Sequence, residues 1–220
     1  MRSFMFAPLL ALVAAAPAHD WTTTISRTAT GAYVIGNPQA RVKLVEYGSY
    51  TCPHCAAFAA ESSAVLKGQM IRSGSTSLEY RHLIRDGLDL DATILARCAG
   101  PRGFAAASEY IFATQNQWFA RGYEYQQVNG QRIALYPKLA QVRALADGAG
   151  LTQMMQARGL SPAAIDACFA DQREIDRLLA ASATLPPQVL GTPAFFINGR
   201  FVPQSGWAGL QPQLRAAGAR

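Results

Sequence analysis

Cysteine is scarce in this chain of 220 residues, which contains four, and charged residues make up only 15% of it. Four cysteines at this length exclude a disulfide-dense miniature scaffold, because a chain of this size can bury a sizeable core without such cross-links. Disorder is excluded as well, since 50% of the residues are hydrophobic. The length allows one large domain or two small ones.

Clusters of one charge are also absent. The formal net charge is +6, but the basic residues are scattered along the chain, with no run of five or more like charges and no basic stretch interleaved with stacking aromatics. A solvated, arginine-rich surface is therefore the favoured interpretation. Nucleic acid is not an expected partner.

The N-terminus carries the longest apolar run. Arg2 precedes an apolar stretch over 4–16, and Ala16-Pro17-Ala18 fits a small-x-small cleavage site. The run is too short for a permanent membrane span and is typical of a secretory signal peptide over 1–18. Cleavage after Ala18 would remove Arg2 and lower the net charge from +6 to +5. The alternative is an uncleaved, lipid-inserted anchor. We expect a periplasmic protein, in a compartment where disulfides persist.

Strand and helix patterns alternate at both ends of the remaining chain. We expect a short strand at 33–35, a buried strand at 41–47, a helix from Pro53 to about Met70 and a strand at 77–84. The C-terminal end has a strand at 194–197, a tight turn at Asn198-Gly199, a partner strand at 201–202 and a helix at 210–217.

The middle of the chain is alanine-rich and helical. Ser161-Pro162 marks a helix start with Ser161 as N-cap, and Pro186-Pro187 ends the last helix. A β-α-β beginning and a β-β-α finish predict an α/β thioredoxin-like fold with a helical insertion. Its expected segments are 19–85, 86–185 and 186–220, in one domain.

Cys52-Pro53-His54-Cys55 is the sharpest motif. It lies where a strand turns into a helix, so that backbone N–H groups and the positive helix end point at Cys52 and favour its thiolate. A helix end contributes about 0.3–2 kcal/mol, whereas one pKa unit requires about 1.4 kcal/mol. Further donors are needed, and the His54 imidazole is the candidate. A stabilised thiolate makes the disulfide a stronger oxidant of its partners.

Zinc binding and a static disulfide are the alternatives for this motif. A structural zinc site needs a second close ligand pair, whereas Cys98 and Cys168 are isolated and His19 and His82 stand alone. Redox catalysis is favoured.

Four cysteines permit three pairings. The chemistry of the motif favours Cys52–Cys55, which leaves Cys98–Cys168 as a structural bridge that pins the helical insertion. A second redox pair and two unbonded thiols are the alternatives.

Glu46 and Thr192-Pro193 complete the candidate site. Glu46 is in phase with Val42 and Leu44 on the buried strand, so we expect a raised pKa and proton exchange with Cys55. The alternative is a carboxylate that reaches solvent at the strand end. A cis bond before Pro193 would expose the backbone of Thr192 for pairing with an extended peptide.

These motifs together resemble the DsbA-like thiol:disulfide oxidoreductases over essentially the whole chain after residue 18. The resemblance implies an exposed nucleophile at Cys52, a buried resolving thiol at Cys55, a thiolate stabiliser at His54, and a cis-proline at Pro193. Glu46 would correspond to the buried acid of the family. Thr192 departs from the valine of the best-known members, and a threonine there is similar to disulfide isomerases and to a broader DsbA-like branch. The Cys98/Cys168 pair departs from the simplest members.

We therefore expect an enzyme that introduces disulfides into reduced or unfolded secreted proteins. It would be a monomer without metal or organic cofactor, and a quinone-linked membrane partner would re-oxidise it. A monomeric reductase or isomerase is the nearest alternative. A secreted peptide-binding module whose Cys52/Cys55 pair only rigidifies a surface is the alternative from another class.

Overall fold

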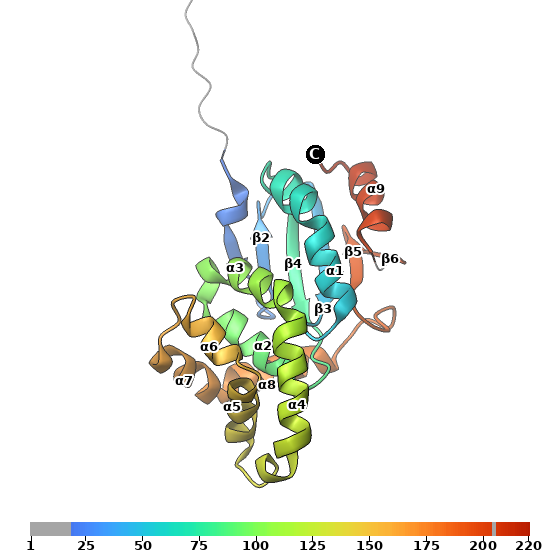
Figure 1. Cartoon of the computed structure of the whole chain (residues 1–220). Helices are drawn as coiled ribbons and strands as arrows, with labels where there is room; N and C mark the ends of the chain where they lie inside the picture. Colours follow the sequence, from blue (N-terminus) through green and yellow to red (C-terminus); the bar gives the residue numbers. More distant parts are fainter. Residues whose placement is uncertain (1–18, 204–205) are drawn as a thin grey trace, which may run out of the picture.

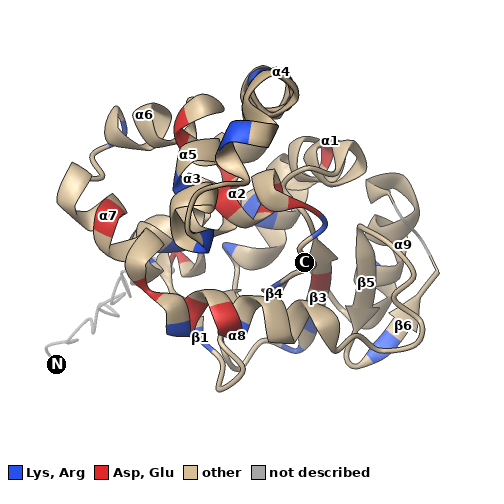
Figure 2. Ribbon diagram, turned by 90° about the horizontal axis from the view of Figure 1, so that it is seen from below, with Lys and Arg blue, Asp and Glu red and all other residues tan. Residues whose placement is uncertain are grey.

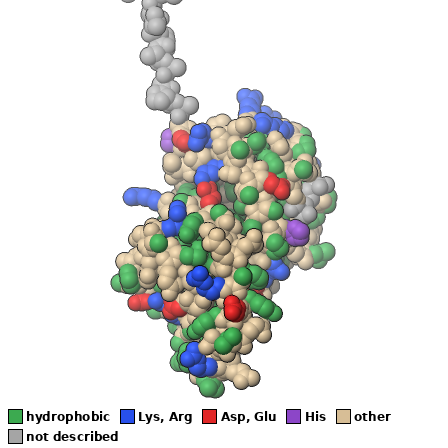
Figure 3. All heavy atoms as spheres, in the orientation of Figure 1, with side chains coloured by type: hydrophobic (Ala, Val, Ile, Leu, Met, Phe, Trp, Pro, Cys, Tyr) green, Lys and Arg blue, Asp and Glu red, His purple; other side chains and the backbone are tan. Residues whose placement is uncertain are grey.

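The computed structural model describes residues 19–203 and 206–220. The expected signal peptide, 1–18, lies outside the described residues. Within them, no helix combines the length and apolar character needed to cross a bilayer. Figure 3 shows basic atoms on one face in small separate groups, with acidic and hydrophobic atoms between them.

Strands and helices follow one another along the chain as drawn in Figure 1. The strands are β1 (Ile25–Arg27), β2 (Tyr33–Gly36), β3 (Val42–Gly48), β4 (Thr76–His82), β5 (Ala194–Ile197) and β6 (Arg200–Val202). The helices are η1 (Trp21–Thr23), α1 (Pro53–Ser62), η2 (Ser63–Ile71), α2 (Gly87–Cys98), α3 (Gly100–Ala113), α4 (Gln115–Ile133), α5 (Lys138–Gly148), α6 (Leu151–Gln156), α7 (Pro162–Ala170), α8 (Gln172–Ala183) and α9 (Trp207–Ala217).

The strands form one mixed sheet in the order β1-β2-β4-β3-β5-β6. β3 pairs in parallel with β4 and antiparallel with β5, so its residues are flanked on both sides. This central place explains why the β3 sequence is largely apolar, since polar side chains there would lose their contact with water. The strand holds two charged residues: Lys43 is exposed, whereas Glu46 is buried and is paired in register with Tyr80 of β4 and Phe195 of β5.

Helices cover both faces of the sheet. Figures 1 and 2 show α1 and α9 on one face and α8 on the other. The remaining helices of the insertion gather mainly beyond the end at which β3 leads into α1. Phe58 of α1 packs on Phe195 of β5 with their ring centroids 4.5 Å apart. Phe104 of α3 stacks on Tyr33 of β2 with a centroid distance of 4.2 Å. One buried apolar cluster therefore runs from the sheet into the insertion.

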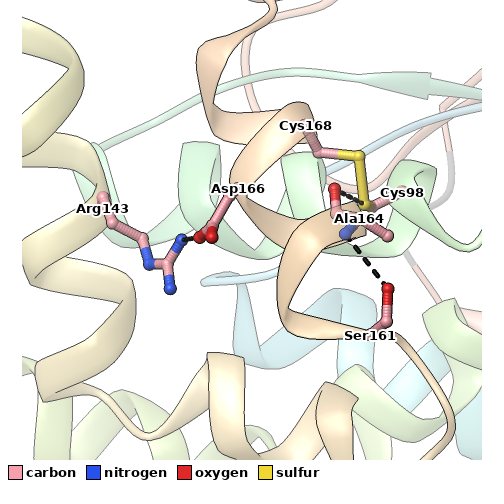
Figure 4. The surroundings of a disulfide bond; sticks show 6 residues. All are labelled: Cys98, Arg143, Ser161, Ala164, Asp166 and Cys168. Carbon is pink, nitrogen blue, oxygen red and sulfur yellow. Dashed lines mark hydrogen bonds and ion pairs between the residues drawn. A yellow bond between two sulfur atoms is a disulfide. The ribbon is translucent and has the colours of Figure 1, made fainter.

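The second cysteine pair is a disulfide, as the sequence predicts. The Sγ atoms of Cys98 and Cys168 are 2.14 Å apart, and the bond joins the last residue of α2 to α7 (Figure 4). Ser161 caps α7, because its hydroxyl accepts a hydrogen bond from the backbone N–H of Ala164 at 3.2 Å. Segments seventy residues apart in the sequence are thus fastened together.

The expected elements are present, with differences at their ends. The strand predicted at 77–84 stops at His82, because the N–H of Ile84 turns away to donate to the Ser182 hydroxyl at 2.8 Å. The helix predicted to run from Pro53 to about Met70 changes to π-helical geometry at Ser63. β1 was not predicted, since its three residues lie in a polar, threonine-rich stretch and gain their strand geometry from pairing with β2.

Candidate active site

Cys52 is the N-cap residue of α1, and Pro53 occupies the first helical position. The backbone N–H of Cys52 donates to the Ser49 carbonyl at 3.2 Å, while its own carbonyl accepts from the N–H groups of Cys55 and Ala56. This turn places the Cys52 side chain in front of the free N–H groups of the first helical turn. Both motif cysteines are free thiols, so the structure represents the reduced form.

The two thiols have opposite acidities. The pKa of Cys52 falls from 9.0 to about 5, chiefly because the Cys55 thiol donates a hydrogen bond to it. Burial opposes this change, and hydrogen bonds from the Thr192 side chain and the backbone N–H groups of Cys55 and His54 add to it. The pKa of Cys55 is raised by that same hydrogen bond, by burial and by the charge of Glu46. Cys52 is therefore the thiolate and Cys55 the protonated thiol near neutral pH.

One expectation about the motif needs correction. Only 3% of Cys52 is exposed, whereas the resemblance implies an exposed residue. The reason is the Thr192 carbonyl, which lies 3.2 Å from Sγ and accepts a hydrogen bond from Cys52 when the thiol is protonated. The His54 side chain is exposed and, among the described residues, its imidazole makes no hydrogen bond. The backbone N–H of residue 54 lowers the pKa of Cys52, and stabilisation of the thiolate by the imidazole stays a prediction.

A groove opens beside Cys52. It encloses about 620 Å³, and the residues that line it are Cys52, Pro53, His54, Leu83, Arg85 and residues of the 185–192 loop. The Thr192-Pro193 peptide bond is cis, as the resemblance implies. The groove thus joins the thiolate to an exposed loop that ends in β5.

Glu46 is buried, with 3% of the residue exposed, so the alternative that it reaches solvent is wrong. Burial raises its pKa to about 8, and the negative charge of the Cys52 thiolate adds to this effect. The residue borders a small cavity of about 100 Å³ beneath α1 and α3. A carboxyl group with this pKa can hold or release a proton near neutrality, which fits the predicted exchange with Cys55.

Three further side chains, which the sequence did not indicate, hold the loop that leads to Cys52. Asp89 of α2 accepts hydrogen bonds from the Ser49 hydroxyl at 2.6 Å and from the Tyr50 N–H at 2.8 Å. Asp86 accepts from the Thr51 hydroxyl at 2.8 Å.

Gln115 of α4 contacts the same loop and donates to the carbonyls of Tyr50 and Cys52 at 2.6 and 2.9 Å. The helical insertion therefore positions the catalytic loop from two sides.

For Asp86 and Asp89 the sequence carries a local signal that indicates the start of a helix but not a contact with the catalytic loop. Asp86 caps α2 by accepting from the Asp89 N–H at 2.9 Å, a spacing that the sequence shows and that predicts a helix start. Nothing in the sequence connects Asp89 or Gln115 with the loop. Burial raises the pKa of Asp89 to about 7, although the hydrogen bonds from Ser49, Arg85 and Tyr50 oppose the change.

Comparisons with known proteins agree with this geometry. The family model described as thioredoxin matches residues 28–216. A protein-disulfide isomerase of Novosphingobium aromaticivorans is 32% identical, superposes with a TM-score of 0.77, and is matched over 83% of this chain and 95% of that one. The chain belongs to the DsbA-like thioredoxin-fold oxidoreductases. The predicted thioredoxin-like fold with a helical insertion is confirmed.

Other members of this family are more distant or longer. Wolbachia pipientis alpha-DsbA1 shares the fold with a TM-score of 0.64 at 19% identity, over 87% of this chain and 91% of that one. A protein of Rickettsia bellii that is named as a protein-disulfide oxidoreductase is 30% identical over 76% of this chain and 56% of its own length. The chain spans about half the length of the curated relatives it matches.

Proposed function

We propose that this DsbA-like protein is a dithiol-disulfide oxidase that introduces disulfide bonds into reduced or unfolded secreted proteins. The proposed location is the periplasm, reached through the signal peptide expected at 1–18. The observation that carries the proposal is the unequal acidity of the two thiols, with the pKa of Cys52 at about 5 and that of Cys55 raised. A stabilised thiolate stabilises the reduced dithiol, so the oxidised enzyme accepts electrons readily.

The reaction begins with the oxidised enzyme. A substrate thiolate attacks Sγ of Cys52 and forms a mixed disulfide, while the Cys52–Cys55 bond breaks. Cys55 leaves as a thiolate and takes a proton, for which the nearby Glu46 is the proposed donor. A second substrate thiolate then attacks the substrate sulfur, and Cys52 leaves as the stabilised thiolate. The substrate gains one disulfide, and the enzyme gains two electrons.

The groove beside Cys52 supports binding of the substrate as an extended peptide. Thr192 precedes β5, and its carbonyl lies 3.2 Å from Sγ of Cys52. A peptide that pairs with this backbone would bring its cysteine to the thiolate by main-chain hydrogen bonds, with little dependence on sequence. A quinone-linked membrane protein is proposed to restore the disulfide, because each turnover leaves the enzyme reduced.

A monomeric reductase or isomerase is the second candidate, and one residue supports it. Thr192 stands directly before the cis-proline Pro193, where the resemblance likens a threonine to the disulfide isomerases. The related protein of Novosphingobium aromaticivorans bears the name of an isomerase.

Equilibration with glutathione buffers distinguishes these functions. For an oxidase we expect a reduction potential nearer to about −120 mV than to the roughly −270 mV of a cytosolic thioredoxin. A value close to the thioredoxin potential would exclude the oxidase. Oxidation of a reduced substrate protein should accompany the high potential, and Cys52→Ser should abolish exchange. Peptide binding with no exchange in the unaltered protein would instead indicate the peptide-binding module.

A further inference from the structure

A second cavity, of about 410 Å³, lies between α8 and the sheet, and Cys52 is not among the residues that line it. Arginines from three elements line it: Arg81 of β4, Arg97 of α2 and Arg177 of α8. No aspartate or glutamate is among the described residues that line it. The apolar part of the wall comes from Ala32 and from α8, whose Leu178 and Ala181 face the cavity. Figure 2 shows α8 running beneath the strands on this side.

The surrounding charges do not balance. The Glu174 carboxylate accepts hydrogen bonds from the guanidinium groups of Arg27, Arg97 and Arg177, so a single negative charge is paired with three positive charges. Burial would raise the pKa of Glu174, but the hydrogen bonds from Arg27 and Arg97 prevail and lower it, so the group is ionised. Asp171 also acts on Arg27 through its charge, so the three arginines face two carboxylates and one positive charge remains without a counter-charge among the described residues beside the cavity.

Arg97 carries the most strongly desolvated of these charges, with 5% of its side chain exposed. Its Nε and Nη2 bind Glu174, and Nη2 also donates to the Gly31 carbonyl at 2.8 Å. Its Nη1 is buried and has no hydrogen-bond partner among the described residues. A buried cation in surroundings of low polarity attracts an anion much more strongly than an exposed one does. Arg97 thus supplies a positive potential from the cavity floor.

Two cavity residues can bind an anion directly, because they are partly exposed. The side chains of Arg177 and Arg81 are 48% and 40% exposed. Arg81 is held in place by Glu79 and by the Tyr47 hydroxyl, each at 2.7 Å, through its Nε and Nη1. Its Nη2 makes none of the hydrogen bonds found in the described part of the chain, which leaves N–H groups for a ligand.

The cavity adjoins the groove beside Cys52. Leu83 and Leu185 line that groove, and they directly follow His82 and Thr184, which line the cavity. The groove and the cavity are therefore neighbours along these two segments, which makes an acidic side chain of a polypeptide bound in the groove a candidate ligand of the cavity.

We propose that the cavity between α8 and the sheet binds a carboxylate carried on a short apolar stem. Two sources share this chemistry: an acidic side chain of the substrate polypeptide, which rests on the proposed function, and a free organic acid. The guanidinium groups match the two oxygens of a carboxylate, and the alanine and leucine wall suits a hydrocarbon stem.

Calorimetric titration tests the site without any exchange reaction. The probes are N-acetylglutamate amide, the matching glutamine derivative and inorganic phosphate. We expect saturable binding of the glutamate derivative, at least tenfold tighter than that of the other two. Binding should weaken about tenfold in Arg177→Ala and in Arg81→Ala. Arg173→Ala is the matched control, because Arg173 is an exposed arginine of α8 that does not line the cavity.

Several outcomes would overturn the assignment: no saturable binding, tighter binding of phosphate, or an equal loss in Arg173→Ala. The source of the carboxylate is identified by comparing the KM values of two cysteine-containing peptides. The peptides are identical except for a glutamate or a glutamine placed three to five residues from the cysteine. A KM ratio of about ten that falls to one in Arg177→Ala identifies the substrate as the source. A ratio of one, with the glutamate derivative still bound, supports the same site with a free acid as its ligand. Because calorimetry measures binding without thiol exchange, the titration still tests the carboxylate site if the protein proves not to be an oxidase.

Discussion

Replacing Cys55 tests the cause of the low Cys52 pKa, because the hydrogen bond from the Cys55 thiol is its largest contributor. Cys55→Ala removes that donor, whereas Cys55→Ser keeps an O–H group at the same place. A hydrogen bond to a charged group contributes about 1.5–3 kcal/mol, and one pKa unit corresponds to about 1.4 kcal/mol. We therefore expect the pKa of Cys52 to rise from about 5 to about 6.5 in Cys55→Ala.

The assay is the ultraviolet absorbance of the thiolate during a pH titration of the reduced protein. At pH 5.5 the ionised fraction of Cys52 should fall from roughly three quarters to about a tenth in Cys55→Ala. In Cys55→Ser the midpoint should stay closer to that of the unaltered protein. Above pH 8 Cys52 is fully ionised in the unaltered protein and in Cys55→Ala. Alkylation of Cys52 should then be about fivefold faster in Cys55→Ala than in the unaltered protein, because the nucleophilicity of a thiolate increases with its pKa.

A midpoint unchanged in Cys55→Ala would refute this reasoning. The thiolate would then be held by the backbone N–H groups of α1 and by Thr192 alone. The same pKa also sets a magnitude for the intact enzyme. A thiol with a pKa of about 5 instead of 9.0 stabilises the reduced form at pH 7 by about 3 kcal/mol, or about 60 mV. That stabilisation increases as the pH rises from 5 to 9 and is lost as the pH falls through 5.

Three further predictions concern the buried acids and the disulfide. The pKa of Glu46 is raised from 4.5 to about 8, so the free energy of unfolding should fall by a few kcal/mol as the pH rises between these values. In denaturant titrations Glu46→Gln should flatten that pH dependence, and in exchange assays it should slow the release of Cys55. An unchanged dependence of stability on pH would contradict the burial argument. Asp89→Asn places an amide N–H₂ against one of the two backbone donors, the N–H of Tyr50 or that of Arg85, so we expect a loss of about 1–3 kcal/mol of unfolding free energy and a lower kcat, whereas an unaltered kcat would show that the loop needs no such anchor. Replacing both Cys98 and Cys168 by alanine opens a closed loop of seventy residues, which should cost about 4 kcal/mol of unfolding free energy and leave the Cys52 titration unchanged; a shift in that titration would make the bridge part of the redox site.

Much of the fold follows from local pattern. The buried strand β3, the start of α7 at Ser161 and the hairpin at Asn198-Gly199 depend on residues within a few positions of one another. Asn198 and Gly199 adopt φ values of 50° and 81°, a geometry that this dipeptide favours over other residues. β1 was missed because its strand geometry depends on its partner β2 rather than on its own sequence.

The candidate site divides in the same way. Cys52 and Cys55 are recognisable from the sequence as a reactive pair because they are three residues apart at the start of one helix. Glu46 is recognisable as an acidic residue in a mainly apolar strand. For His54 the sequence predicts a role of the imidazole, whereas the structure adds a role that the residue type does not show, because its backbone N–H lowers the pKa of Cys52 while its side chain is exposed. A residue's type does not reveal which of its groups faces a neighbour.

Short-range spacing along the chain is enough to predict the reactive pair, its place at a helix start and the α/β order of the elements. Three other features appear only in the folded chain: the Thr192 carbonyl covers Cys52, Asp89 and Gln115 hold the catalytic loop, and Glu174 binds three arginines. Apart from Arg177 and Glu174, which are three positions apart on α8, these contacts join residues 40 to 147 positions apart. Packing of whole elements brings them together, and local sequence carries no signal for it.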